Sequence, residues 1–163
     1  MPSIPDPKPV KDLFESLLGR DVTISPMDEP VVPTARRACC VGLYVDPNQD
    51  VKAIVAADLD LSARAGAALG LVPAAGAETA IENRELPAAL YDNFYEVMNI
   101  FASLFNPDGT DKEEHLKLSS VFQPGSVIPT NAARMLRGLG KRADFQLDID
   151  GYGKGALGMV VPL

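Results

Sequence analysis

The sequence is poor in the side chains that most often bind metals or carry nucleophilic chemistry. It holds one histidine, His115, two adjacent cysteines, Cys39 and Cys40, and no tryptophan. A single histidine excludes a metal site built from several histidines, and a Ser/His/Asp triad would have to use that one residue. Adjacent cysteines in an apolar run do not form a disulfide framework, so we expect two buried thiols in a strand.

Basic side chains are also scarce. Lysine and arginine together number 15, aspartate and glutamate 22, and the net charge is −7. This balance excludes the basic stripe that a nucleic-acid surface needs. No apolar run approaches the roughly 20 residues of a membrane span, and the first residues lack the charged start and apolar core of a signal peptide. We therefore expect a cytoplasmic protein with no nucleic-acid partner and no membrane span.

The length and composition suit one globular domain. Of the 163 residues, 47% are apolar and 23% are charged, which are ordinary values for such a domain. Seven of the 14 prolines fall within the first 33 residues. Proline lacks a backbone N–H donor and disfavours the helical conformation of the residue before it. The prolines in residues 1–9 therefore predict an extended arm. Residues 10–163 predict a single α/β domain without internal repeats or linkers.

Hydrophobic periodicity and turn residues predict about six strands and about four helices. The helices are expected at 10–18, ending at Gly19, and at 60–70 with Asp60 or Ser62 as N-cap, 85–105 and 130–139. The strands are expected at 21–25, 38–45, 51–57, 115–122, 143–150 and 156–162, and residues 71–84 are expected to form a loop. Because most strands are neighbours in hairpins, the fold class is α+β with a mostly antiparallel or mixed sheet.

The helix at 85–105 carries the main candidate site. On a wheel of 100° per residue, Asp92, Glu96, Asn99 and Ser103 fall within about 60° of one another. The opposite side of the wheel is apolar and carries Leu90, Phe94, Val97, Phe101, Leu104 and Phe105. The helix is therefore predicted to bury its back and to present an aspartate, a glutamate and an asparagine in line. An ordinary solvated helix face is the alternative interpretation.

The segment DNFYEVMN, residues 92–99, resembles the D/S-x3-E-x2-N signature of the CheC/CheX/FliY family of chemotaxis phosphatases. A proline follows the asparagine in that family; here Pro124 follows after 24 intervening residues, two more than usual, and Pro129 is a second candidate. The order of the other predicted elements is also similar to CheX-like domains. A second E-x2-N is absent, which resembles CheX rather than the two-site CheC. Ser103 stands where the family usually has glycine.

This resemblance implies a phosphatase that hydrolyses the aspartyl phosphate of a CheY-like response-regulator receiver domain. Asn99 would orient the attacking water and Glu96 would dock to the receiver's lysine, so these two are the expected catalytic residues. Asp92, Ser103 and Pro124 are the expected binding residues. The chain is expected to need no cofactor and no metal ligands of its own, because Mg²⁺ belongs to the phosphorylated receiver.

The residue types suit this chemistry, although the fold alone does not decide activity. Phosphoryl transfer needs positioning and charge stabilisation, and an asparagine amide can hold a water without adding charge beside a phosphate. A non-catalytic receiver-binding or flagellar-switch-like adaptor of the same fold is the alternative. The Glu96 and Asn99 pair favours the enzyme. Two departures from the family pattern favour the adaptor: the longer spacing to Pro124, and the serine at position 103. The resemblance also implies a homodimer, through sheet edges at 38–57 or 143–162.

Overall fold

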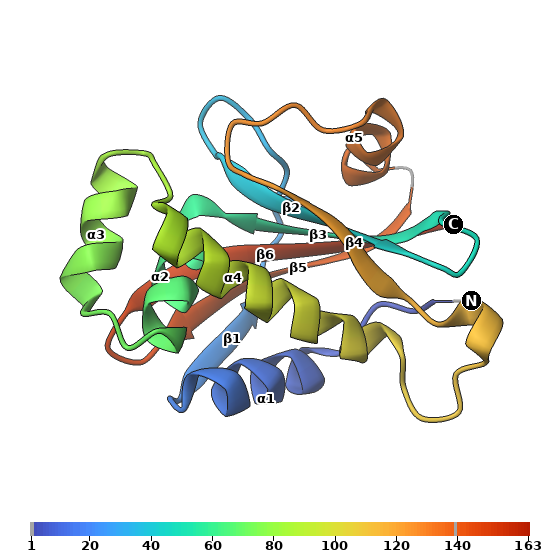
Figure 1. Cartoon of the computed structure of the whole chain (residues 1–163), viewed down its shortest axis with the longest axis horizontal. Helices are drawn as coiled ribbons and strands as arrows, with labels where there is room; N and C mark the ends of the chain where they lie inside the picture. The colour runs from blue at the N-terminus through green and yellow to red at the C-terminus, as the bar shows by residue number, and fades with distance from the viewer. Residues whose placement is uncertain (1, 139) are drawn as a thin grey trace.

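A six-stranded antiparallel sheet forms the centre of the protein, as the computed structural model shows over residues 2–138 and 140–163 (Figure 1). The order across the sheet is β1-β5-β6-β3-β2-β4. The strands are β1 (Val22–Pro26), β2 (Cys39–Val45), β3 (Val51–Asp58), β4 (Lys117–Phe122), β5 (Gly140–Ile149) and β6 (Gly153–Pro162). Every strand pair is antiparallel, and β2–β3 and β5–β6 are hairpins, so the predicted α+β fold class is confirmed.

Helices cover the two faces of the sheet unequally. One face packs against α1 (Pro7–Leu18), α2 (Leu59–Leu69), α3 (Ala74–Glu82) and α4 (Ala88–Phe101) around the larger core. The other face packs against α5 (Thr130–Leu136) and the segment before β2, around a smaller core. Figure 1 shows α4 crossing in front of the strands, with α5 beyond the opposite face of the sheet.

The two cores explain why β2 is apolar throughout. Cys40 and Tyr44 point into the larger core, while Cys39, Val41 and Leu43 point into the smaller one. A strand buried on both faces has no solvent side for polar residues to occupy. The predicted buried thiols are confirmed, and burial raises the pKa of Cys39 to about 12 and that of Cys40 to about 11. Both thiols are therefore neutral side chains of the core.

The N-terminal helix begins earlier than the sequence predicts. Helix α1 starts at Pro7, so only residues 2–6 of the expected arm at 1–9 lie outside helix and strand. Proline fits the first turn of a helix, where its missing N–H has no intrahelical partner and its fixed φ is already helical. The end of the helix is as predicted: Gly19 caps it with φ 64°, and its N–H donates to the Glu15 carbonyl.

Three further local expectations are wrong. Residues 71–84 are not all loop, because α3 forms within them and buries Ala77 and Ala80. Alanine is the strongest helix former, and this outweighs the single Gly76. The N-cap of α2 is Asp58, whose carboxylate accepts the Leu61 N–H at 2.8 Å, rather than Asp60 or Ser62. The expected helix at 130–139 ends at Leu136, and residue 139 lies outside the described residues.

The sheet edges also differ from expectation. The strands in 38–57 and 143–162 are all interior, since β2, β3, β5 and β6 each have a neighbour on both sides. The two edges are β1 and β4, which the sequence pattern did not distinguish from interior strands. Any pairing of this sheet with a second copy would therefore use β1 or β4. Among the described residues, no helix is both long and apolar enough to cross a bilayer.

Helices α2 and α4 approach closely at Gly66. A Cβ at this position would lie 2.5 Å from the carbonyl oxygen of Leu90 in α4, which is closer than real Cβ contacts. The Asn93 amide donates to the Gly66 carbonyl at 3.0 Å and fixes the same crossing. The absence of a side chain at Gly66 therefore sets how near α4 lies to the rest of the core.

We expect Gly66→Ala to lower the free energy of unfolding by about 1–3 kcal/mol, because the new methyl group forces α2 and α4 apart. The usual effect of Gly→Ala inside a helix is stabilising by up to about 1 kcal/mol. The sign of the change, measured by urea denaturation, thus tests the close approach. Gly76→Ala in α3 is the control, since its Cβ would meet only a Val72 methyl group. Equal effects at the two positions would contradict the packing argument.

Candidate functional site

The candidate site lies on α4 and the short 3₁₀ helix that continues it. Residues 88–101 are α-helical, and η1 (Ala102–Phe105) is 3₁₀-helical. Pro87 occupies the N-cap position rather than the first turn, so the expected helix at 85–105 begins three residues late. The back of α4 is buried at Leu90, Phe94, Val97 and Phe101, as the wheel predicts. Met98, which the wheel did not include, is also buried, and Leu104 is only half-buried.

The polar residues of this helix form the exposed stripe that the wheel predicts. Asp92, Glu96, Asn99 and Ser103 are all exposed, and we call these four residues the polar stripe. Ser103 lies in the 3₁₀ segment, where each residue turns by about 120° instead of 100°. This winding moves Ser103 by roughly 40° from its position on a regular α-helical wheel, toward the side of Glu96.

A buried hydrogen bond holds the helix where its winding changes. The Ala102 N–H bonds to the Asn99 carbonyl, three residues back, rather than to the Met98 carbonyl that an α-helix would use. The Met98 carbonyl instead accepts the Tyr44 hydroxyl at 2.7 Å. Burial raises the pKa of Tyr44, so its hydroxyl keeps the proton that it donates. Tyr44 of β2 thus fixes the backbone immediately before Asn99.

Three more contacts hold α4 along its length. Asn93 donates to α2, the Tyr91 hydroxyl donates to the Val121 carbonyl of β4 at 3.3 Å, and Phe101 packs edge-on against Phe14 of α1 with ring centroids 6.4 Å apart. The helix is therefore held by elements on several sides. The polar stripe lies on the one side that these contacts leave open.

Pro124 lies apart from the asparagine end of the stripe. Leu118 and Met98 both lie beside Gly42, whereas Val121 meets Tyr91, so β4 and α4 run in opposite directions. Pro124 follows β4 in a turn closed by the Ser126 N–H and the Gln123 carbonyl. It therefore lies toward the N-terminal half of α4, while Asn99 lies near the C-terminal end. The structure brings Asp92, Glu96, Asn99 and Ser103 together but does not bring Pro124 to Asn99.

The stripe is an exposed surface with unpaired polar groups. Within the part of the chain that the structure describes, the side chains of Asp92, Glu96 and Asn99 have no hydrogen bond or ion pair. Five cavities that these residues form lie elsewhere, and no member of the stripe lines any of the five. The same residues contain no group of three or more His, Cys, Asp or Glu that could hold a metal ion. Such a surface suits a macromolecular partner better than a small molecule.

Tyr95 is a candidate that the sequence analysis missed. Its side chain is 39% exposed, and its ring packs against Tyr91 with centroids 6.3 Å apart. It falls about 40° from Asn99 on the helical wheel, on the side away from Glu96. Exposed tyrosines are enriched at protein interfaces because they combine a large apolar ring with a hydrogen-bonding end. The helical wheel alone could have indicated Tyr95, because it places this aromatic residue at the margin of the polar stripe.

The fold of the chain is similar to that of the FliM middle domain and of FliY. The FliM middle domain from H. pylori matches with a TM-score of 0.59 at 11% identity, over 95% of this chain and 84% of that one. FliY from Thermotoga maritima matches with a TM-score of 0.51 at 13% identity, over 93% of this chain and 81% of that one. The resemblance inferred from the sequence is therefore confirmed at the level of the fold.

Comparison with CheX itself is weaker. The CheX-CheY-BeF3-Mg+2 complex from Borrelia burgdorferi matches with a TM-score of 0.47 at 9% identity, over 93% of this chain and 92% of that one. The likeness to CheX thus depends on the motif of residues 92–99 and not on this overlap. No protein-family model and no curated protein sequence matches the chain.

We expect Tyr44→Phe to lower the free energy of unfolding by about 1–3 kcal/mol, because it leaves the buried Met98 carbonyl without its donor. Urea denaturation measures the change. Tyr95→Phe is the matched control, since that side chain is partly exposed. A Tyr44→Phe protein as stable as the control would show that the hydroxyl does not support the end of α4.

Proposed function

We propose that the chain is a phosphatase for the aspartyl phosphate of a response-regulator receiver domain. The observation that carries the proposal is the polar stripe, which presents Glu96 and Asn99 unpaired on the open side of an otherwise tightly held helix. Their order on the helix matches the D/S-x3-E-x2-N signature, and the fold of FliY is compatible with it. An exposed polar helix face can contact the active site of a partner, whereas a phosphatase for small molecules needs a pocket of its own.

Asn99 is assigned the role of orienting the attacking water. Its amide has one acceptor oxygen and two donor hydrogens, so it can accept from the water and donate to an acceptor beside the phosphate. It carries no charge that would repel the phosphate. The fixed backbone between Met98 and Ala102 reduces the freedom of this side chain, and pre-organisation of that kind accelerates transfer.

Glu96 and its neighbours are assigned the docking. The Glu96 carboxylate would pair with the lysine that contacts phosphate in the receiver, and this pairing would fix the register of the helix. Asp92 lies one turn earlier on the same face and would extend the acidic contact. The ring of Tyr95 would cover the side of the stripe next to Asn99. Magnesium is assigned to the receiver, in the same site as the phosphoryl group, and the proposal assigns the chain to the cytoplasm.

A non-catalytic binding module is the second candidate. The TM-score is higher for the FliM middle domain than for FliY. FliM from H. pylori has been solved in complexes with FliG and with SpeE, so domains of this fold serve as protein-binding modules. Under this alternative the polar stripe docks a receiver without shortening the lifetime of its phosphate. A homodimer through the exposed edge of β4 or β1 is compatible with both candidates.

We expect Asn99→Ala to slow hydrolysis of a phosphorylated receiver by roughly 100-fold while the Kd for the receiver stays nearly unchanged, because the amide positions only the attacking water. The measurement is the decay of radiolabelled phospho-receiver with and without the chain, together with a titration against a beryllofluoride-loaded receiver. Asn131→Ala is the control, since Asn131 is an exposed helical asparagine on α5.

The same assay separates the two candidates. A wild-type chain that binds the receiver without accelerating decay supports the binding module. An Asn99→Ala protein that is as active as wild type would refute the assigned role of Asn99.

We expect Glu96→Ala to weaken receiver binding by roughly tenfold, because a charge-assisted contact across the interface is lost. Raising the salt concentration should weaken the wild-type complex more than the variant complex, since the variant lacks this charge pair. Glu82→Ala on α3 is the control, as Glu82 is also exposed but lies off α4. Equal salt dependence of the wild type and Glu96→Ala would contradict a docking role.

A further inference from the structure

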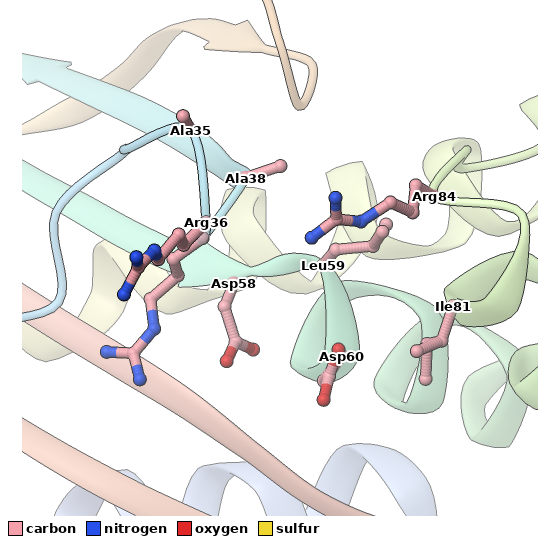
Figure 2. A pocket seen from close by; sticks show the side chains of 9 residues that line it. Ala35, Arg36, Ala38, Asp58, Leu59, Asp60, Ile81 and Arg84 are labelled. Carbon is pink, nitrogen blue, oxygen red and sulfur yellow. The ribbon is translucent and has the colours of Figure 1, made fainter.

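A cavity of about 470 Å³ lies away from the polar stripe, where the chain enters α2 (Figure 2). Its walls come from three parts of the chain: the segment before β2, the first turn of α2 and the loop after α3. Three arginines line it, Arg36 and Arg37 from the first segment and Arg84 from the last. A volume of this size lies within the roughly 300–1,000 Å³ typical of small-molecule sites.

The acidic residues of the cavity already have partners. Asp58 accepts the N–H groups of Leu61 at 2.8 Å and of Ala156 at 3.1 Å, so its carboxylate caps α2 and ties it to β6. Asp60 forms an ion pair with Arg64 at 3.6 Å. The N-terminus of α2 is thus capped internally. Three arginines and two aspartates line the cavity, so the positive charges exceed the negative ones by one.

The side chains of the arginines are less constrained, although the charge of Arg37 partly offsets the rise that burial causes in the pKa of Asp58. In residues 2–138 and 140–163, the side chains of Arg36, Arg37 and Arg84 form no hydrogen bond and no ion pair. One Nη atom of Arg37 is also buried from solvent. A buried donor on a charged group without an acceptor is costly, and such a group signals a ligand that supplies the acceptor.

Arg84 occupies a backbone position that normally favours glycine. Its φ is 53°, and the N–H groups of Arg84 and Glu85 bond back to the carbonyls of Ile81 and Ala80, which closes the end of α3. A residue with a Cβ is disfavoured there by about 1–2 kcal/mol. Figure 2 shows the Arg84 side chain extended from this loop across the start of α2, toward the segment before β2.

From these features we infer that the cavity binds a small organic phosphate through Arg36, Arg37 and Arg84. Guanidinium groups donate paired hydrogen bonds that match phosphate oxygens, and Arg36 and Arg84 are exposed, so their donors are open to such a group. Leu59 and Ile81 provide an apolar wall for the organic part of the ligand. Because none of these residues belongs to the polar stripe, the site is independent of the proposed phosphatase activity.

The test is calorimetric titration of the full chain at low salt with three probes: ADP, inorganic pyrophosphate and inorganic phosphate. We expect ADP to bind most tightly and phosphate most weakly. Arg36→Gln and Arg84→Gly should each weaken ADP binding about tenfold or more, as expected for loss of a charged hydrogen bond. Arg134→Gln on α5 is the control, because Arg134 is an exposed arginine outside the cavity.

Arg84→Gly also separates a loss of binding from a loss of folding. Glycine fits the positive φ at residue 84, so the melting temperature of this variant should equal or exceed that of the wild type while ADP binding falls. The inference is overturned if ADP does not bind, if phosphate binds as tightly as ADP, or if Arg134→Gln weakens ADP binding as much as the cavity variants do.

Discussion

The close packing of α4 against α2 and the sheet is the constraint on which the candidate site depends. Gly66 lets the two helices approach to backbone distance, and the Asn93 amide bonds to the Gly66 carbonyl at that crossing. Because these contacts use one side of α4 fully, its rotation about its own axis is fixed. The polar stripe therefore faces solvent, and its residues do not need to contact one another to stay in this orientation.

Tyr44 extends this constraint to the end of the helix. A change from α to 3₁₀ winding leaves a carbonyl without its regular partner, and in a buried position that carbonyl would be costly. The Tyr44 hydroxyl, on the interior strand β2, donates a hydrogen bond to the Met98 carbonyl and so satisfies it. The position of Asn99 is thus tied to a strand that is paired on both sides, and such strands are among the more stable parts of a fold.

Local pattern predicted most of the fold and the polar stripe, because both depend on periodicities that a sequence displays directly. The apolar back of 85–105 and the hairpins at 38–57 and 143–162 are of this type. What could not be predicted depends on contacts between distant segments. Asp58, the N-cap of α2, also accepts the N–H of Ala156, a residue far away in the sequence. Strand β2 is interior because β4, another distant segment, pairs beside it. The arginine-lined cavity joins Arg36 to Arg84 across 48 residues, and no spacing in the sequence indicates that pairing.

The two candidate sites differ in shape, and the shape indicates what each can recognise. The stripe is exposed and holds an amide and carboxylates without cations, so it can act on a phosphate only if a partner supplies the compensating positive charge. The cavity is concave and holds three arginines, so the phosphate that we infer there would meet cationic donors of this chain itself. A chain with seven more acidic than basic residues thus concentrates three unpaired arginines at one place and keeps the stripe free of them. The two proposals together assign a phosphorylated protein to one surface and a free phosphate ester to the other.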